Sequence, residues 1–391
     1  TAYIQNKQTA KGTEYLEQAV AVAPDTAGIR TQLALGRLAS GDTSQAVKEL
    51  EPAVDLGQNV FQADVLLIML HLREKRYEKA LTQAQAFSKK APSSPLPSNL
   101  MGAAYIGLDQ LGMAREKFQL ALTKDSHFLP AIMNLAKIDE RDGKTEDARG
   151  RYESILKQEE NHVGALLSLA RLADTEGKGE EAVRLLEKAW ESNEGAIQPG
   201  MMLIAYYNGK QQPLRAVSIA RDLDVKHPNN PAILNALGMS QMAAKEYHNA
   251  QATFESLVEL LPKAPEAHLA LGRVNMQLDD TNSAKKNVNK SLSLSEDFLH
   301  AQLFMAQLEL KEKRPKAALA TAKKIQQQRP TEAVGFRLQG DVLMIQGQYS
   351  SAVKSYQQAY DKLPVASLAI AIFQERKRHT LKSSMFPWKT D

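Results

Sequence analysis

An alanine recurs every 34 residues along most of this chain, and this spacing constrains the fold more than any other feature of the sequence. The recurrence holds ten times without an insertion or deletion, at Ala46, Ala80, Ala114, Ala148, Ala182, Ala216, Ala250, Ala284, Ala318 and Ala352. A fixed period of this length is typical of chains built from one repeated supersecondary unit, in which each unit buries its apolar face against its neighbours. The 391 residues are therefore expected to form a repeat array rather than two or three globular domains.

The positions around these alanines keep the same phase. The residue twelve places before each alanine is small in eight repeats and is isoleucine in the other two, at Ile68 and Ile204. The residue four places after it is apolar throughout, and the series is Leu50, Ala84, Phe118, Tyr152, Leu186, Ala220, Phe254, Val288, Ala322 and Tyr356. Proline often stands twelve places after it, at Pro92, Pro228, Pro262, Pro330 and Pro364, and Pro24 stands twelve places after Gly12, the preceding position in the same phase. This pattern predicts two helices in each unit, each with one apolar face.

We expect each unit to be a pair of antiparallel helices joined by a tight turn. Glycines between the two predicted helices support this, for example at Gly41, Gly143, Gly177 and Gly347. The proline cannot continue the second helix, so it is expected in the connection to the next unit. We also expect the small residue of the first helix to face the alanine of the second, and the larger apolar residues to fill the space toward the next unit.

The 34-residue spacing, with its small, aromatic and proline positions, resembles the tetratricopeptide repeat (TPR). The unit that carries the resemblance best includes residues 99–105, followed by Ala114 and Phe118. The position at which the family has tryptophan holds varied residues here, among them Arg30 and Phe336. The resemblance implies an all-α fold, namely a right-handed α-solenoid of antiparallel helix hairpins that winds into a superhelix.

The phase of the repeat divides the chain into three parts. Residues 27–366 are predicted to be ten tandem 34-residue units. Residues 1–26 are predicted to be the end of a truncated preceding repeat. Residues 367–391 are predicted to form a terminal helix and an irregular tail, because the next alanine position in phase holds Phe386.

The residues that usually carry catalysis or bind metals are not arranged for it in this sequence. No two of the eight histidines are three to five residues apart, and the chain has no cysteine, so no helix face offers the usual spacing of metal ligands. The net charge of +4 does not favour nucleic acid, and no apolar run reaches the roughly 18 residues of a membrane helix. We therefore expect no enzymatic activity, no metal, no cofactor, no nucleic-acid partner and no transmembrane segment.

The resemblance also implies that partners bind along a concave face, lined by positions 2, 5, 9, 12 and 13 of each first helix. Seven of the twelve methionines fall on these positions, where an even distribution would place about 1.5. Methionine is flexible and is frequent on adaptable binding surfaces. The predicted groove residues are Met69, Asn99, Met133, Lys137, Arg171, Met201, Asn235, Met239, Met242, Arg273, Met276, Arg337 and Met344. The alternative is that several of these methionines are buried between neighbouring first helices.

These features predict a non-catalytic scaffold that binds protein or peptide segments. The segment 367–376 and the Ala- and Leu-rich repeats resemble the PEP-CTERM system-associated TPR lipoprotein of bacterial exopolysaccharide export and sorting loci. This resemblance implies a periplasmic or outer-membrane-anchored bacterial protein that supports export of exopolysaccharide or surface proteins. The alternative is the substrate-recruiting arm of an enzyme, such as a glycosyltransferase, whose catalytic domain lies outside this sequence. A peptide-sensing transcriptional regulator would need a helix-turn-helix segment, and no stretch departs from the 34-residue phase to provide one.

Overall fold

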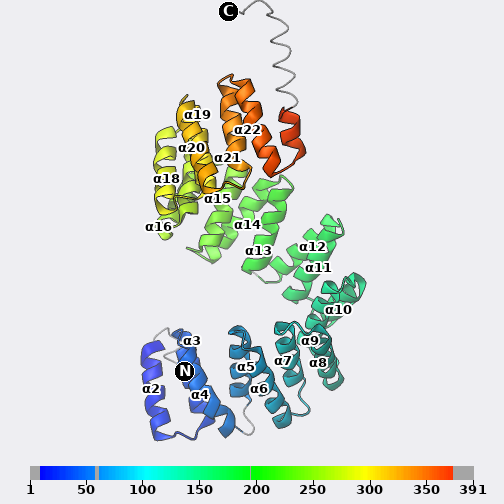
Figure 1. The fold of residues 1–391 in the computed structure, drawn as a ribbon. Helices are drawn as coiled ribbons and strands as arrows, with labels where there is room; N and C mark the ends of the chain where they lie inside the picture. Colours follow the sequence, from blue (N-terminus) through cyan, green and yellow to red (C-terminus); the bar gives the residue numbers. More distant parts are fainter. Residues whose placement is uncertain (1–8, 58–60, 194, 373–391) are drawn as a thin grey trace, which may run out of the picture. The chain divides into compact units, whose positions relative to one another are not determined.

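The computed structural model describes residues 9–57, 61–193 and 195–372, and these residues form α-helices joined by short turns (Figure 1). Within each compact part of the chain every helix packs against the helix that follows it, and successive helices pair as antiparallel hairpins. The predicted all-α architecture of stacked hairpins is therefore confirmed. Residues 373–391, which include most of the predicted irregular tail, lie outside the described residues.

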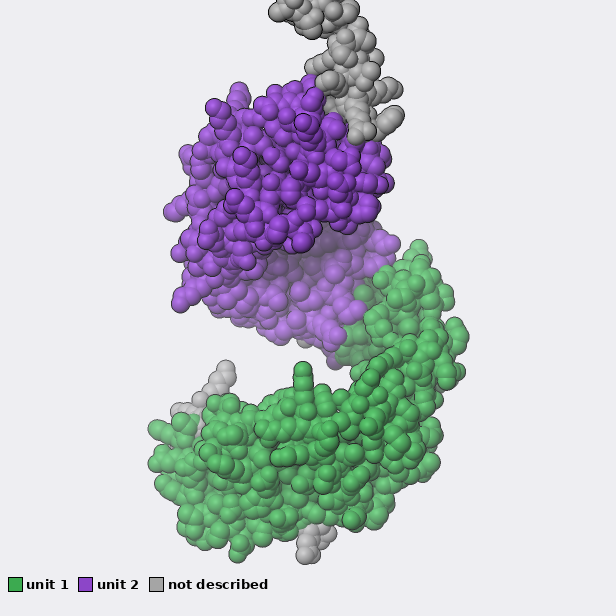
Figure 2. All heavy atoms as spheres, in the orientation of Figure 1, with its two compact units in different colours: residues 1–192 green, residues 193–391 purple. Residues whose placement is uncertain are grey.

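The chain forms two compact units, residues 1–192 and 193–391, which are coloured separately in Figure 2. Unit 1 begins with α2 (Thr9–Val22), which packs against α3. The first helices of its hairpins are α3 (Ala27–Ala39), α5 (Gln62–Arg73), α7 (Leu96–Gly107), α9 (Leu129–Arg141) and α11 (Val163–Thr175). The second helices are α4 (Thr43–Leu56), α6 (Tyr77–Lys90), α8 (Leu111–Lys124), α10 (Thr145–Gln158) and α12 (Gly179–Glu191).

Unit 2 repeats the same arrangement and ends in helical residues 366–372. Its first helices are α13 (Ile197–Gly209), α15 (Pro231–Ala243), α17 (Pro265–Gln277), α19 (Leu299–Lys311) and α21 (Val334–Ile345). Its second helices are α14 (Pro213–Lys226), α16 (Tyr247–Leu260), α18 (Thr281–Leu294), α20 (Pro315–Gln328) and α22 (Tyr349–Lys362). Within this unit the first helices of two pairs of neighbouring hairpins also touch, α13 with α15 and α17 with α19.

A residue with a left-handed backbone lies in the turn of each of the ten hairpins from α3–α4 to α21–α22. Glycine takes this place in four turns, at Gly41, Gly143, Gly177 and Gly347. In the other six the residue is Lys75, Asp109, Gln211, Lys245, Asp279 or Lys313, with φ between 57° and 61°. The left-handed residue ends the first helix, because the amide after it bonds back to the carbonyl five residues earlier, as Arg314 does to Glu309 at 2.7 Å.

The six non-glycine turns carry backbone strain that glycine would relieve, because a side chain in the left-handed region costs about 1–2 kcal/mol. We expect Lys313→Gly to raise the free energy of unfolding by up to about 1 kcal/mol, the gain being reduced by the greater freedom of glycine in the unfolded chain. Thermal and urea denaturation followed by circular dichroism would measure it. The control is Lys323→Gly, inside α20, which should destabilise by about 1 kcal/mol. Equal destabilisation by both substitutions would contradict this account.

The recurring alanines form the centre of the core. All ten are at most 1% exposed, and each lies on a second helix. A larger side chain at these places would separate the two helices, which explains why alanine recurs without exception.

The small residue of the first helix faces this alanine in the hairpin of Gly272, where a Cβ atom would lie 3.2 Å from the carbonyl oxygen of Ala284. In three other hairpins the prediction from the sequence is wrong, because the small residue faces an aromatic ring. A Cβ atom on Gly102 would lie 2.5 Å from the ring of Phe118, the residue four places after the alanine. The same holds for Gly238 against Phe254, at 2.6 Å. The aromatic rings therefore fill space inside their own hairpin instead of only bridging to the next one.

The sizes of these two facing positions compensate each other. Glycine stands opposite an aromatic ring in three hairpins, as in the pair Gly340 and Tyr356. The two isoleucines that depart from the small pattern, Ile68 and Ile204, belong to repeats in which the second position is only alanine, Ala84 and Ala220. In these five hairpins a bulky residue on one helix is thus balanced by a small one on the other, which limits the variation in volume inside the hairpin.

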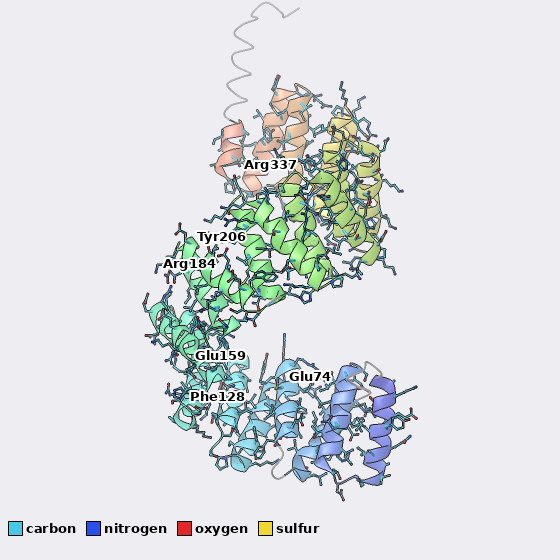
Figure 3. The ribbon with its side chains drawn as sticks, turned by 180° about the vertical axis from the view of Figure 1, so that it is seen from behind. Glu74, Phe128, Glu159, Arg184, Tyr206 and Arg337 are labelled. Atoms are coloured by element: carbon cyan, nitrogen blue, oxygen red, sulfur yellow. The ribbon has the colours of Figure 1, made fainter. Side chains whose placement is uncertain are left out.

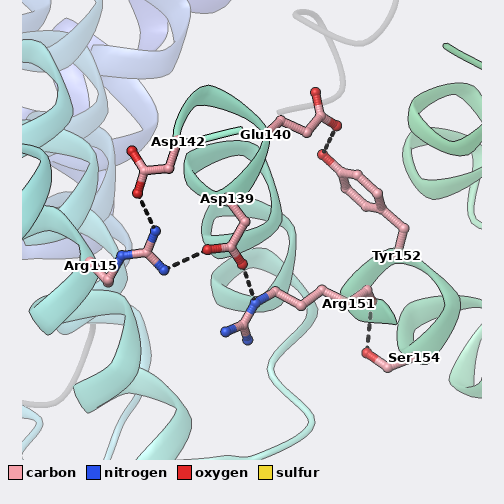
Figure 4. Close-up of polar contacts among 7 residues, drawn as sticks. All are labelled: Arg115, Asp139, Glu140, Asp142, Arg151, Tyr152 and Ser154. Atoms are coloured by element: carbon pink, nitrogen blue, oxygen red, sulfur yellow. Dashed lines mark hydrogen bonds and ion pairs between the residues drawn. The ribbon is translucent and has the colours of Figure 1, made fainter. Parts of the chain in front are cut away.

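A buried carboxylate joins two neighbouring hairpins of unit 1 (Figure 4). Asp139 on α9 is 1% exposed, and its two oxygens accept hydrogen bonds from Arg115 on α8 at 2.6 Å and from Arg151 on α10 at 2.7 Å. Arg115 also reaches Asp142 at 2.8 Å. Burial alone would raise the pKa of Asp139, but the hydrogen bonds and charges of the two arginines hold this pKa below its ordinary value.

Asp64 on α5 offers the contrasting case. It is 2% exposed, and one of its oxygens accepts a hydrogen bond from Lys90 at 3.0 Å while the other has no partner among the described residues. Desolvation is the largest influence on this carboxyl, so its pKa is raised above the ordinary value in spite of Lys90. Two buried aspartates on equivalent helices therefore respond to acid in opposite directions.

Among the described residues, no helix combines the length and the apolar character needed to cross a lipid bilayer.

Candidate binding pocket on the first helices

The predicted groove residues lie on the first helices of their hairpins, and in unit 1 they differ in accessibility. Met69 on α5 is 54% exposed, and Lys137 on α9 is exposed. Arg171 on α11 is exposed too, but its guanidinium is 2.6 Å from the carboxylate of Glu140 on the preceding first helix. A ligand of Arg171 would have to share or displace this ion pair.

Two other predicted residues of unit 1 take part in packing. Asn99 on α7 is 8% exposed and accepts a hydrogen bond from Asn134 on α9 at 3.1 Å. Met133 is partly buried against the core cluster of α9, α10 and α11. A partner could reach Asn99 only after its contact with Asn134 opened, and the alternative of buried methionines describes Met133 well.

In unit 2 the exposed predicted residues are Asn235, Met239, Arg273 and Arg337, and Met201 is half-buried. Met239 is 50% exposed. Arg337 lies on α21 (Figure 3). The remaining three are partly buried and pack against core clusters: Met242, Met276 and Met344.

Four of these residues lie together around one cavity. Asn235, Met239 and Met242 of α15 and Arg273 of α17 line a pocket of about 250 Å³. These residues come together because α15 and α17 both pack on α16, which places the two first helices in successive hairpins. This cavity, which we call the α15–α19 pocket, contains more of the predicted residues than the other cavities described in unit 2.

The rest of the lining was not selected from the sequence. It consists of Phe254, Glu266, Leu269, Ala270, Phe298 and His300. Glu266 and His300 are the second residues of α17 and α19, and therefore occupy a position already assigned to the groove by the family resemblance. Glu266 and His300 were not among the predicted groove residues, because that prediction rested on methionines, asparagines and cations. Phe298 precedes α19 and lies against His300 with 5.7 Å between ring centroids, a contact that no positional rule indicates.

The pocket contains one cation and one carboxylate, Arg273 and Glu266, and no ion pair joins them among the described contacts. The side chain of Arg273 forms no hydrogen bond or ion pair with the described residues, and partial desolvation lowers the pKa of its guanidinium. Its side chain keeps substantial contact with solvent, and an arginine with a somewhat lowered pKa is still protonated at neutral pH. The pocket therefore presents an apolar wall of Met239, Met242 and Leu269 beside a guanidinium that is not engaged in an ion pair.

This lining is suited to binding a ligand. Methionine side chains adapt their shape to a ligand, and arginine binds a carboxylate through two parallel hydrogen bonds. No group of three or more histidine, aspartate or glutamate side chains within the described residues is placed to hold a metal ion. What the pocket can supply is thus shape, apolar contact and charge.

An ordered series of stacked helix hairpins defines a helical-repeat scaffold of the tetratricopeptide class. The chain belongs to the family of the tetratricopeptide repeat protein 21 second ARM domain, whose model matches residues 75–313, more than half of the sequence. A second family model, tetratricopeptide repeat, matches residues 31–95. Families of these repeats are generally non-catalytic scaffolds that bind proteins or peptides. No curated protein matches the chain in sequence.

Solved structures with similar folds include a chain from the crystal structure of the APC/C hetero-tetramer Cut9-Hcn1. That match has 13% identity and a TM-score of 0.42, and it covers 97% of this chain and 82% of that chain. The C-terminal part of a TPR repeat-containing protein from Cytophaga hutchinsonii is another, with 15% identity and a TM-score of 0.49 over 61% of this chain and 97% of that chain.

Proposed function

We propose that the α15–α19 pocket binds a segment of a partner protein that presents a bulky apolar side chain next to a carboxylate. The observation that carries this proposal is the unpaired guanidinium of Arg273 beside the apolar wall of Met239, Met242 and Leu269. Burial of the apolar side chain would supply most of the affinity. The carboxylate would neutralise Arg273 and fix the orientation of the segment.

Affinity capture with matched variants tests this function. We expect Met239→Asp to weaken binding of the partner at least about tenfold, because it places a negative charge on the apolar wall and repels the carboxylate of the ligand. Arg273→Glu should act in the same way. Circular dichroism should show unchanged helix content, because both side chains are largely exposed.

The control is Met113→Asp on α8, where a methionine is 39% exposed but lies outside the predicted groove. A protein retained by wild type and Met113→Asp, and lost by both pocket variants, would support the proposal and identify the partner. Capture of the same proteins by all four chains would refute it. Met276 is less suitable for substitution, since it packs against a core cluster and a charge there would disturb the fold as well as the surface.

The more specific role in export of bacterial exopolysaccharide or surface proteins, at the periplasmic face or on an outer-membrane anchor, is also a proposal. It is supported by the resemblance of residues 367–376 to the export-associated TPR lipoproteins, although residues 373–376 lie outside the described part of the chain. Fractionation of the source cells with an antibody against this chain would test it. Recovery in the cytosol would refute it, and a glycosyltransferase domain in the same polypeptide would favour the substrate-recruiting arm instead.

A further inference from the structure

A second surface of unit 2 departs from the repeat pattern in several respects at once. It lies at the turns of the hairpins α13–α14 and α15–α16, and we call it the turn-edge site, defined by Lys210, Gln211, Leu214, Arg215, Ala243, Ala244 and Lys245. Most of these residues line a hollow of about 540 Å³. None of them belongs to the lining of the α15–α19 pocket, and only Ala243 falls on one of the five groove positions, so the inference below does not depend on the function proposed for that pocket.

An exposed leucine stands where every other hairpin has a polar residue or glycine. Leu214 is the second residue of α14, and its side chain is 68% exposed. The equivalent residues of the other second helices are Ser44, Glu78, Gly112, Glu146, Glu180, His248, Asn282, Lys316 and Ser350. Because this position does not contribute to the core in any hairpin, a leucine here is not explained by folding.

A contact that closes the same edge elsewhere is missing at this site. In two other hairpins the left-handed turn residue forms an ion pair with the last residue of the next first helix, Asp109 with Arg141 at 2.9 Å and Asp279 with Lys311 at 2.8 Å. The corresponding residues here are Gln211 and Ala243. The short side chain of Ala243 cannot bridge the turns, and the hollow is left open.

The site also carries positive charge that the protein does not neutralise. Lys210, Arg215 and Lys245 are exposed and form no ion pair with the described residues. The ammonium of Lys210 lies 5.6 Å from the ring centroid of Tyr206, which Figure 3 places on α13, and the guanidinium carbon of Arg215 lies 5.3 Å from that of Tyr207. These rings hold the cations in position without cancelling their charge.

The nearest acidic side chain in sequence is already engaged. Glu246 accepts hydrogen bonds from Arg221 at 2.6 Å and from Asn249 at 2.9 Å. The field at the hollow is therefore positive, and it complements a negatively charged ligand.

We infer that the turn-edge site binds an acidic segment of a partner protein that inserts one apolar side chain against Leu214. The hollow accepts the side chain, and carboxylates on either side of it pair with Arg215 and Lys245. A protein segment fits better than a membrane surface, because Leu214 lines a concave hollow while a bilayer requires apolar groups that project together from a convex surface.

Peptide pools of defined composition provide the test. One pool has a central Leu, Phe or Met flanked by positions drawn from Asp, Glu and Ala; a second replaces the acids by Lys, and a third replaces the central residue by Ala. Binding is measured by fluorescence anisotropy in a chain carrying Met239→Asp and Arg273→Gln, so that the α15–α19 pocket does not contribute. We expect this chain to prefer the first pool, and the addition of Leu214→Gln to weaken that binding about tenfold.

The control for the leucine is Val225→Gln, which changes a side chain that is 80% exposed at the other end of the same helix and should leave binding unchanged. Arg215→Glu tests the charges and should abolish the preference for the acidic pool. Its control is Lys323→Glu on α20, which should leave that preference unchanged. The inference is overturned if the acidic pool is not preferred, if Leu214→Gln and Val225→Gln behave alike, or if the chain binds vesicles of anionic lipid through Leu214 in place of the peptides.

Discussion

Gly102→Ile is expected to destabilise the hairpin α7–α8 by about 3 kcal/mol, and Phe118→Ala in the same chain is expected to restore most of that loss. The single substitution drives new side-chain atoms into a ring that already lies 2.5 Å from where a Cβ would stand. Phe118→Ala alone should destabilise by about 3–5 kcal/mol through the cavity it leaves. Together the two changes reproduce the pairing of Ile68 with Ala84, which the chain already contains.

A double-mutant cycle measures this compensation. The coupling energy should be at least about 2 kcal/mol in favour of the double variant, as expected for residues in direct contact. Urea denaturation would report on the whole chain, and hydrogen exchange of the α7 and α8 amides on the hairpin itself, since repeat arrays can open locally. A matched cycle with Gly112→Ile, at a glycine with no neighbour within 4 Å, should be additive with Phe118→Ala. Additivity in both cycles would show that the sizes are not paired.

Asp139→Asn is expected to destabilise unit 1 by about 2–3 kcal/mol at pH 7, because it leaves Arg115 and Arg151 facing each other without the carboxylate between them. The effect should depend on pH. The folded-state pKa of Asp139 lies below its ordinary value of 3.8, so its contribution is fully present above about pH 4 and is lost as the pH falls through the lower folded-state pKa. The difference between wild type and variant should therefore shrink toward zero in acid.

Asp64→Asn is the matched control for this prediction. The pKa of Asp64 is raised in the folded state, so protonation favours the fold, and stability attributable to this group increases as the pH falls through that pKa. Asp64→Asn should accordingly be neutral or mildly stabilising at pH 7. Urea midpoints at pH 7, 5 and 3 would separate the two aspartates, and equal loss of stability in both variants at pH 7 would contradict the assignment of their environments.

Much of the fold could be predicted from the sequence, because the determinants of a hairpin lie within one 34-residue period. The alanines, the turn glycines and the proline breaks each have a local physical meaning, and the structure places them as expected. The facing of Gly102 and Phe118 was misjudged although its signal was present: Ile68 and Ile204 appeared to be exceptions only because each position was considered alone. Comparison of the two positions repeat by repeat would have revealed the compensation.

The site was less predictable, because it is built from several repeats whereas the pattern describes one repeat at a time. The positional rule selected Asn235, Met239, Met242 and Arg273, but a cavity depends on side chains from three successive first helices at once. Whether a methionine is exposed, as Met239 is, or packed against the core depends on neighbours that periodicity does not reveal. Leu214 lies on a second helix, and the groove rule of the family gives positions on first helices alone.

The bulky and the small residue that compensate each other lie within the same hairpin. This has a consequence for how such a chain can change in length. A whole 34-residue unit that is duplicated or deleted carries its own balance of volumes with it, whereas a cut through the middle of a unit would combine unmatched halves, such as an isoleucine with a phenylalanine. Recombination between repeats is thus tolerated in steps of one complete hairpin. Junctions such as the one held by Asp139 are the exception, because there the partner residues come from adjacent units and must be inherited together.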